Sequence, residues 1–308
     1  MALTSKAKQQ RRKARERKAE HAAQVRAQRR SVQARPVSEK SWEILEWCYE
    51  YLPSHFYGDP AEFHLEIEEI LTEELGKENG RAAFAAPRGH NKSTFISLGL
   101  ILYRCAEHRE PYVLIVSDTK GQASDHLGNI KLELEENSRL VNDYPHLALP
   151  EGKDYTKKSV KNSVSEIVTL GGIKLEAKGA GQSLRGARRG AQRPSLIVVD
   201  DLENDEAVES KEQREKLDKW FKNSLSNLPG ASGATIVVVG TILHKKSLLT
   251  RLLSEKEFKT YSKRLYRAIK EDGTALWPAA WTLEKLKAKR DEIGSKSFSQ
   301  EFMNEPVD

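Results

Sequence analysis

One ten-residue stretch constrains the fold more than any other part of the sequence: Ala85-Ala86-Pro87-Arg88-Gly89-His90-Asn91-Lys92-Ser93-Thr94. The apolar run 81–85 predicts a buried strand, and the apolar run 95–103 predicts a helix with Ser93 and Thr94 in its first turn. A strand, a tight loop, Lys-Ser-Thr and a helix form a phosphate-binding loop, because N–H groups at a helix N-terminus face the anion. Lys92 is then placed to reach the β- and γ-phosphates of a nucleotide, and Ser93 to ligate Mg²⁺.

This loop departs from the usual pattern G-x-x-x-x-G-K-[ST], because the two glycine positions hold Ala86 and Asn91. Asn tolerates a positive φ better than other residues with a Cβ, so we expect Asn91 to keep the turn. Gly89 adds freedom inside the loop. On this stretch alone, an ordinary strand–loop–helix connection with a capping serine is the alternative interpretation.

A second feature of the sequence, which is acidic, completes the predicted site. The run 195–199 predicts a buried strand, and it ends in Asp200-Asp201-Leu202-Glu203. In a nucleotide-hydrolysing site, Asp200 at the strand's end would hold Mg²⁺ through water, and a nearby carboxylate would orient and deprotonate the attacking water. The alternative is a buried strand that meets a solvated acidic loop.

The remaining pattern predicts an α/β fold, with a mainly parallel central sheet flanked by helices. Further strands are expected at 112–116, 234–239 and, more weakly, 259–266, and helices at 38–52, 65–75, from 122 to about 140, 210–225, from 282 to about 293 and from 297. The runs 166–170 and 173–177 predict a β-hairpin insertion with a two-residue turn at Gly171-Gly172. Polar residues at the ends of parallel strands face the ligand crevice, so Asp118 and Thr241 are expected near the loop.

Charge divides the chain unevenly. Residues 1–40 contain 13 Lys and Arg against 3 Asp and Glu, a net charge of +10, whereas the rest has 38 against 42. We expect residues 1–36 to form a basic, disordered or solvated helical arm that either contacts DNA or an acidic partner or only aids solubility. The two cysteines, Cys48 and Cys105, form no spaced motif, and neither a membrane span nor a signal peptide is apparent.

Aromatic residues before the first strand, Phe56, Tyr57 and Phe63 beside His64, have two possible roles. Such groups can hold the adenine ring of a nucleotide or pack in the core, and core packing is the favoured interpretation.

With these segments in place, the chain resembles the ATPase domain of the large terminase subunit of tailed bacteriophages from about Pro53 onward. The resemblance rests on several segments: 87–94, Val116-Ser117-Asp118-Thr119 with Gln122-Ala123, Ser183-Leu184-Arg185-Gly186, 193–201, Gly240-Thr241 and Trp277-Pro278. It implies a P-loop NTPase fold of the RecA/helicase-like ASCE type. It also implies an ATP- and Mg²⁺-dependent motor that drives double-stranded DNA into a procapsid.

The resemblance assigns roles to particular residues. The nucleotide-binding loop is Pro87, Arg88, Gly89, His90, Asn91, Lys92, Ser93 and Thr94, with Ser93 and Asp200 as Mg²⁺ ligands. Arg88 matches the loop arginine, Arg185 stands where some members carry an arginine finger that reaches a neighbouring subunit, and Gly240-Thr241 matches the motif that couples ATP state to movement. The family usually has Glu after the Mg²⁺ aspartate, whereas this chain has Asp201. Asp201 is the favoured catalytic base and Glu203 the alternative.

The resemblance also implies surroundings for the protein. The expected partners are double-stranded DNA, the portal protein and the small terminase subunit, in a homo-oligomeric ring in the cytoplasm of the infected host and away from membranes. The predicted ATPase domain covers 37–308, with N-terminal helices in 37–80, a core in 81–270 and a helical segment in 271–308. Large terminases continue into a nuclease domain, which is expected to be absent here, so no DNA cleavage is expected from this chain alone.

Two other functions fit the same residues. One is a helicase-like or other DNA-dependent P-loop ATPase, which would share Lys92 and Asp200. The other is a nucleotide-binding assembly protein with little turnover, since both glycines of the usual loop pattern and the usual Glu are missing.

Overall fold

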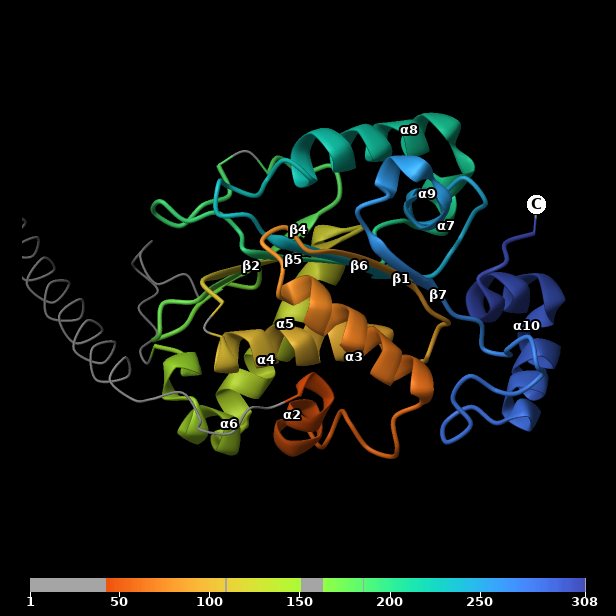
Figure 1. Cartoon of the computed structure of the whole chain (residues 1–308), viewed down its shortest axis with the longest axis horizontal. Helices are drawn as coiled ribbons and strands as arrows, with labels where there is room; N and C mark the ends of the chain where they lie inside the picture. Colours follow the sequence, from red (N-terminus) through yellow and green to blue (C-terminus); the bar gives the residue numbers. More distant parts are fainter. Residues whose placement is uncertain (1–42, 109, 151–162, 185, 308) are drawn as a thin grey trace, which may run out of the picture.

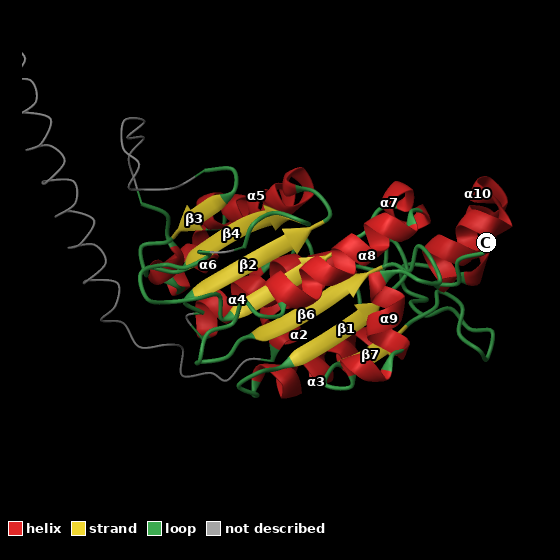
Figure 2. Ribbon diagram, turned by 90° about the horizontal axis from the view of Figure 1, so that it is seen from above, coloured by secondary structure: helices red, strands yellow, loops and turns green. Residues whose placement is uncertain are grey.

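A seven-stranded sheet forms the centre of the protein, in the order β3-β4-β2-β5-β6-β1-β7 (Figures 1 and 2). The structure, a computed structural model, describes residues 43–108, 110–150, 163–184 and 186–307. The strands are β1 (Arg81–Ala85), β2 (Tyr112–Ser117), β3 (Glu166–Val168), β4 (Lys174–Gly179), β5 (Leu196–Asp200), β6 (Thr235–Gly240) and β7 (Ser262–Leu265). All neighbouring strands pair in parallel except β3 with β4, so the predicted mainly parallel α/β sheet is confirmed.

Helices cover both faces of the sheet (Figure 1). One face carries α2 (Ile44–Tyr51), α3 (Glu62–Leu75), α4 (Ile101–Glu107), α5 (Lys120–Glu136) and α6 (Ser138–Asp143), and the other carries α7 (Asp205–Glu209), α8 (Lys211–Trp220) and α9 (Leu248–Ser254). Helix α10 (Leu283–Met303) lies beyond the β7 end of the sheet and is kinked at Gly294. Two π-helical segments, η1 (Thr94–Leu100) and η3 (Phe221–Leu225), and two 3₁₀ turns, η2 (Pro145–Leu147) and η4 (Lys256–Phe258), complete the described elements.

The central strands are apolar throughout because both faces of the sheet are buried. In β5, Leu196 and Val198 belong to the core under α2–α6, whereas Ile197 and Val199 belong to the core under α8 and α9. This alternation places the chain at the end of each strand between two helical layers. Because these strands pair in parallel, the carboxyl ends of β1, β2, β5 and β6 meet at one edge of the sheet (Figure 2).

Several sequence predictions need correction. The hairpin is part of the main sheet, because β4 pairs in parallel with β2 and β3 forms the edge. Its loop has three residues, 170–172, rather than two, since Thr169 N donates to Ile173 O at 3.0 Å. The second helix begins at Glu62, three residues earlier than expected, and the long helix after β2 breaks at Asn137, whose side chain caps α6. Helices α7 and α9 were not predicted.

The expected arm, residues 1–36, lies outside the described residues, as do 37–42 of the first predicted helix.

Candidate nucleotide-binding site

The loop after β1 has the backbone that the sequence pattern predicts. Asn91 has φ 64° and Gly89 has φ 73°, so Asn91 does hold the left-handed conformation for which glycine is usual. Ala86 needs no such conformation: its N–H donates to Gly240 O at 3.0 Å and ties the loop to β6. Within the described chain, the N–H groups of Asn91, Lys92 and Ser93 donate to no protein acceptor. Free N–H groups at a helix start form an anion site.

The helix that follows carries the cation and the hydroxyl of the site. Lys92 is buried, with Nζ 3.8 Å from Asp201 Oδ2. Ser93 Oγ donates to Asp200 Oδ1 at 3.1 Å, and Thr94 begins η1. Residues from two distant segments of the chain, 92–93 and 200–201, are thus brought together as the sequence predicts.

Asp200 is fully buried at the end of β5. Besides Ser93, it accepts a 2.5 Å hydrogen bond from Ser97 Oγ at Oδ2, and His126 Nε2 on α5 lies 3.5 Å from the same oxygen. Burial raises the pKa of Asp200, the neighbouring charge of Asp201 raises it further, and His126, Ser97 and Lys92 oppose this shift.

Two members of this cluster, Ser97 and His126, were not predicted. Ser97 lies four residues after Ser93 on the same helix, so its spacing was a signal that it faces the same acidic group. His126 approaches Asp200 only because α5 packs along the sheet, which no local pattern reveals.

The donors around Asp200 fit Mg²⁺. This ion prefers oxygen ligands and is usually held by one or two carboxylates, substrate phosphates and waters rather than by a complete protein cage. Ser93 Oγ and Asp200 Oδ1 supply such a partial set. No cluster of three or more His, Cys, Asp or Glu suited to a metal occurs among the described residues.

The two carboxylates considered for the catalytic base lie in different surroundings. Asp201 has φ 45°, is partly exposed, and has a carboxylate oxygen near Lys92. Glu203 instead accepts from the backbone N–H groups of Leu248 (2.8 Å) and Leu249 (3.1 Å), at the start of α9. Burial raises the pKa of Glu203, and these hydrogen bonds oppose the shift. The carboxylate of Glu203 thus caps a helix, whereas that of Asp201 faces the loop lysine.

Gly240 and Thr241 lie against the start of the loop. Thr241 Oγ1 donates to Ala86 O at 3.4 Å. A Cβ added to Gly240 would lie 3.2 Å from Asp201 Oδ1, so the small residue leaves room for that carboxylate. The end of β6 therefore contacts both the loop and Asp201.

The two predicted arginines have different outcomes. Arg88 is bound to α10: its N–H donates to Glu301 O at 2.9 Å, and its Nε donates to Glu301 Oε2 at 2.6 Å. Arg185 lies outside the described residues, so its predicted role as a finger stays a prediction.

His90 and Trp281 close one side of the loop. The two rings stack with centroids 5.7 Å apart, and Trp281 Nε1 donates to Gly89 O at 2.9 Å. Burial lowers the pKa of His90 to about 4. Nδ1 of His90 lies 3.0 Å from Arg88 O, while its buried Nε2 has no hydrogen-bond partner in the described structure.

A cavity of about 440 Å³ opens beside the loop. Gly89 and Asn91 line it, together with His55, Tyr57, Gly58, Asp59, Trp277, Ala279, Ala280, Trp281 and Lys285. Tyr57 is 78% exposed, whereas Phe56, Phe63 and His64 are buried. Of the aromatic residues considered from the sequence, these three pack in the core as expected, and Tyr57 alone lines this cavity.

Comparison with known proteins places the fold. No family model and no curated protein matches the sequence. Solved structures do: a point mutant of the large terminase ATPase domain of Thermus phage P74-26 matches with TM-score 0.54 and 13% identity over 84% of this chain and 97% of that domain. The large terminase of bacteriophage HK97 matches with TM-score 0.56 and 12% identity over 86% of this chain and 55% of that protein.

The chain has the fold of these terminase ATPase domains, and the resemblance inferred from its motifs is confirmed at this level. It matches nearly the whole isolated ATPase domain but about half the length of the HK97 protein. No helix in the described parts of the chain is long and apolar enough to cross a membrane.

Proposed function

We propose that this chain is the ATP-hydrolysing motor domain of a viral DNA-packaging terminase, which moves double-stranded DNA into a procapsid. The observation that carries the proposal is the convergence of Lys92, Ser93, Asp200 and Asp201 at one edge of a terminase-type sheet. The wider assembly, with a portal protein, a small terminase subunit and further copies in a ring, is proposed with it.

Each residue has a definite task in the proposed reaction. Lys92 and the free N–H groups of Asn91 and Ser93 bind the phosphates, and their positive charge offsets the charge that develops in the transition state. Ser93 and Asp200 would hold Mg²⁺, which would neutralise negative charge on the phosphates. Ser97 and His126 keep the Asp200 carboxylate turned toward Ser93.

Asp201 is the proposed base that orients and deprotonates the attacking water. It lies beside Lys92, is partly exposed, and has no helix to cap, whereas both oxygens of Glu203 accept from α9. Arg88 and, from a neighbouring copy, Arg185 are proposed to stabilise the transferred phosphoryl group. Thr241, whose hydroxyl donates a hydrogen bond to Ala86 O, is proposed to transmit a conformational change of the loop to β6.

We also propose the cavity beside the loop as the place for the adenine base. The exposed Tyr57 ring is available for stacking, and Asp59 and Lys285 offer polar groups. Tyr57→Ala should raise KM for ATP by roughly fivefold with little change in kcat, since stacking of this kind is worth about 1 kcal/mol. Leu132→Ala, at a half-exposed position on α5 outside this lining, is the control.

The test of the main proposal is steady-state phosphate release at high protein concentration, with and without duplex DNA. The parent should turn over and respond to DNA, and Lys92→Ala should abolish turnover. Lys211→Ala, at a largely exposed position on α8, should not. Strand separation on a forked duplex would indicate a helicase-like enzyme instead. Tight ATP binding without phosphate release in any assembly would indicate the nucleotide-binding assembly protein.

A further inference from the structure

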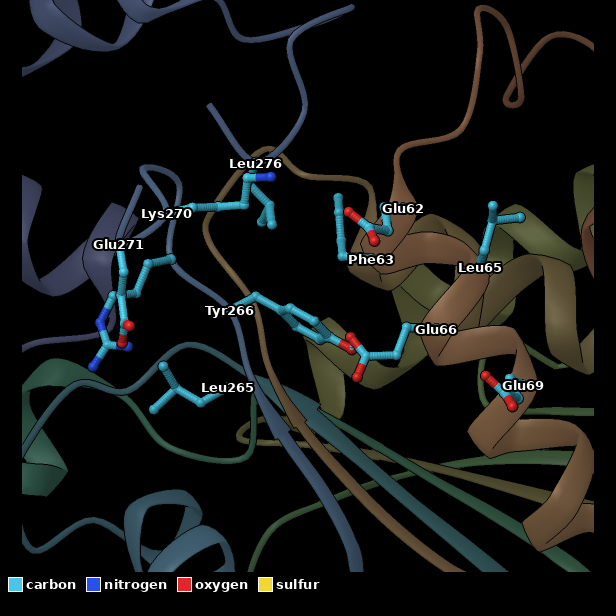
Figure 3. Close-up of a pocket in the computed structure, with 11 residues that line it drawn as sticks. Glu62, Phe63, Leu65, Glu66, Glu69, Leu265, Tyr266, Lys270, Glu271 and Leu276 are labelled. Atoms are coloured by element: carbon cyan, nitrogen blue, oxygen red, sulfur yellow. Dashed lines mark hydrogen bonds between the residues drawn. The ribbon is translucent and has the colours of Figure 1, made fainter. Parts of the chain in front are cut away.

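Another cavity, of about 660 Å³, shares no lining residue with the cavity beside the nucleotide-binding loop (Figure 3). One wall is the outer face of α3, and the other is the segment 265–276 that follows the edge strand β7. We call it the acidic groove. Its lining is Glu62, Phe63, Leu65, Glu66, Glu69, Leu265, Tyr266, Arg267, Lys270, Glu271 and Leu276.

The charges of this lining are unbalanced. Helix α3 contains six Glu and no Lys or Arg, and three of these Glu line the groove with Glu271. The two cations of the lining already have partners outside it, since Arg267 pairs with Glu305 (2.7 Å) and Lys270 with Asp272 (3.8 Å). Glu66 is paired with Arg264 and accepts from Tyr266. Within the described chain no hydrogen bond or ion pair is found for Glu62 or Glu271, so these two carboxylates present uncompensated negative charge in the groove.

The groove also offers apolar contact. Phe63 and Tyr266 are buried in its floor, and Figure 3 shows Tyr266 pointing across toward Glu66, to which its hydroxyl donates at 3.0 Å. Leu65 is 50% exposed and Leu265 is 36% exposed at its sides. Such a surface suits long basic side chains, whose methylene stems pack on apolar groups while the charged ends reach carboxylates.

We propose that the acidic groove binds the basic N-terminal arm of the same chain, residues 1–36. The arm belongs to the first 40 residues, which carry a net charge of +10, whereas the rest of the chain carries −4. This charge complementarity identifies the occupant, and the inference holds whether or not the chain is a packaging motor.

Docking within one copy is favoured over docking between copies. Exposed ion pairs contribute only about 0–1 kcal/mol each, so a separate basic peptide would bind weakly. A tethered segment has an effective concentration on the order of millimolar, which makes the same contacts sufficient. The arm enters the described structure just before α2, and α2 packs against α3.

The docked arm would be exchanged for nucleic acid. Duplex DNA carries far more negative charge than the groove, and it gains from counterion release on binding a basic segment. The groove would therefore hold the arm until DNA is present. Added salt would weaken the binding of the arm both to the groove and to DNA.

The test is carbodiimide cross-linking of the full chain, which joins lysine amines to carboxylates in direct contact, followed by mass spectrometry. At low ionic strength, arm lysines such as Lys8, Lys13 and Lys18 should link to Glu62, Glu69 or Glu271. The yield should fall several-fold at about 0.5 M salt, where the Debye length is about 4 Å. Added duplex DNA should lower it as well.

The variant Glu62→Gln/Glu69→Gln/Glu271→Gln should lose trypsin protection of the arm as well as the cross-links. The matched control, Glu206→Gln/Glu209→Gln/Glu215→Gln, removes the same charge from α7 and α8 and should leave both unchanged. Arm cross-links that map elsewhere, or arm protection equal in the two variants, would overturn the proposal. Links between isotopically labelled and unlabelled copies would overturn the assignment to the same chain.

Discussion

Arg88 of the nucleotide-binding loop is held by Glu301 of α10 through two hydrogen bonds, one from its backbone and one from its guanidinium. The same arginine is a proposed phosphate ligand. Its Nε–H is engaged by Glu301 Oε2 at 2.6 Å, so this donor reaches a phosphate only if that bond breaks. Glu301 and a bound nucleotide are therefore expected to compete for Arg88.

Glu301→Gln should tighten nucleotide binding by removing the charge that competes for Arg88. Because Arg88 is largely exposed, the gain should be at most about 1 kcal/mol, or roughly fivefold in Kd. A titration with a fluorescent nucleotide measures it. Glu305→Gln, which removes a carboxylate paired with Arg267, is the control. An unchanged Kd for Glu301→Gln would show that the two groups do not compete.

Asp201→Asn should lower the rate of phosphate release by about 100-fold or more, because general-base catalysis contributes about 10²–10⁴. Its effect on the free energy of unfolding should be small, since Asp201 is partly exposed. Glu203→Gln should affect stability more than the rate of phosphate release. It removes a charged acceptor from the N-terminus of α9, with a cost of about 1–2 kcal/mol in stability and a smaller effect on rate. Reversed results in phosphate release and urea unfolding would make Glu203 the base.

His126→Ala should weaken Mg²⁺-dependent nucleotide binding several-fold, because Asp200 Oδ2 would lose one of its two nearby partners. Titration with Mg²⁺ at fixed nucleotide measures this effect separately from turnover. Asp125→Ala, at the exposed neighbouring position on α5, is the control. If His126→Ala and Asp125→Ala give the same Mg²⁺ dependence, His126 has no part in positioning Asp200.

Stability should fall as the pH is lowered from about 6.5 toward 4. Burial lowers the pKa of both His64 and His90 to about 4, so the unfolded chain binds protons in this window while the folded chain does not. Each histidine then contributes up to about 1.4 kcal/mol per pH unit.

Urea unfolding across this range, for the parent and for His64→Gln, measures the slope. The parent slope should exceed that of the variant. Protonation of His64 also removes the acceptor for Ala61 N–H, now bonded to Nδ1 at 3.1 Å. Equal slopes would mean that His64 is not kept neutral in the folded state.

The local parts of the site could be predicted from the sequence. The positive φ of Asn91 follows from its place in the loop, and the meeting of Ser93 with Asp200 follows from the rule that parallel strands end at one edge. The strands themselves were predictable because two-sided burial leaves continuous apolar runs.

The unpredicted parts depend on packing between distant segments. The sequence near Glu203 gives no sign of a hydrogen-bond partner for its carboxylate. The partners are two N–H groups of α9, which begins 45 residues further on. The contact between Arg88 and Glu301 spans 213 residues and has no local signal. The hairpin loop was misjudged by one residue because Gly171-Gly172 is also compatible with a three-residue loop in which Thr169 pairs with Ile173.

The attachment of α10 to the loop also has a mechanical consequence. Asn304 anchors the end of this helix by donating to Tyr266 O at 2.7 Å and accepting from Ile242 N–H at 2.8 Å. A load applied near residue 304 is therefore shared between these two anchors and the Arg88 peptide, which Glu301 holds. Tension on α10 would act directly on the loop that binds the phosphates, so force on this helix and the nucleotide affinity of the loop should depend on each other.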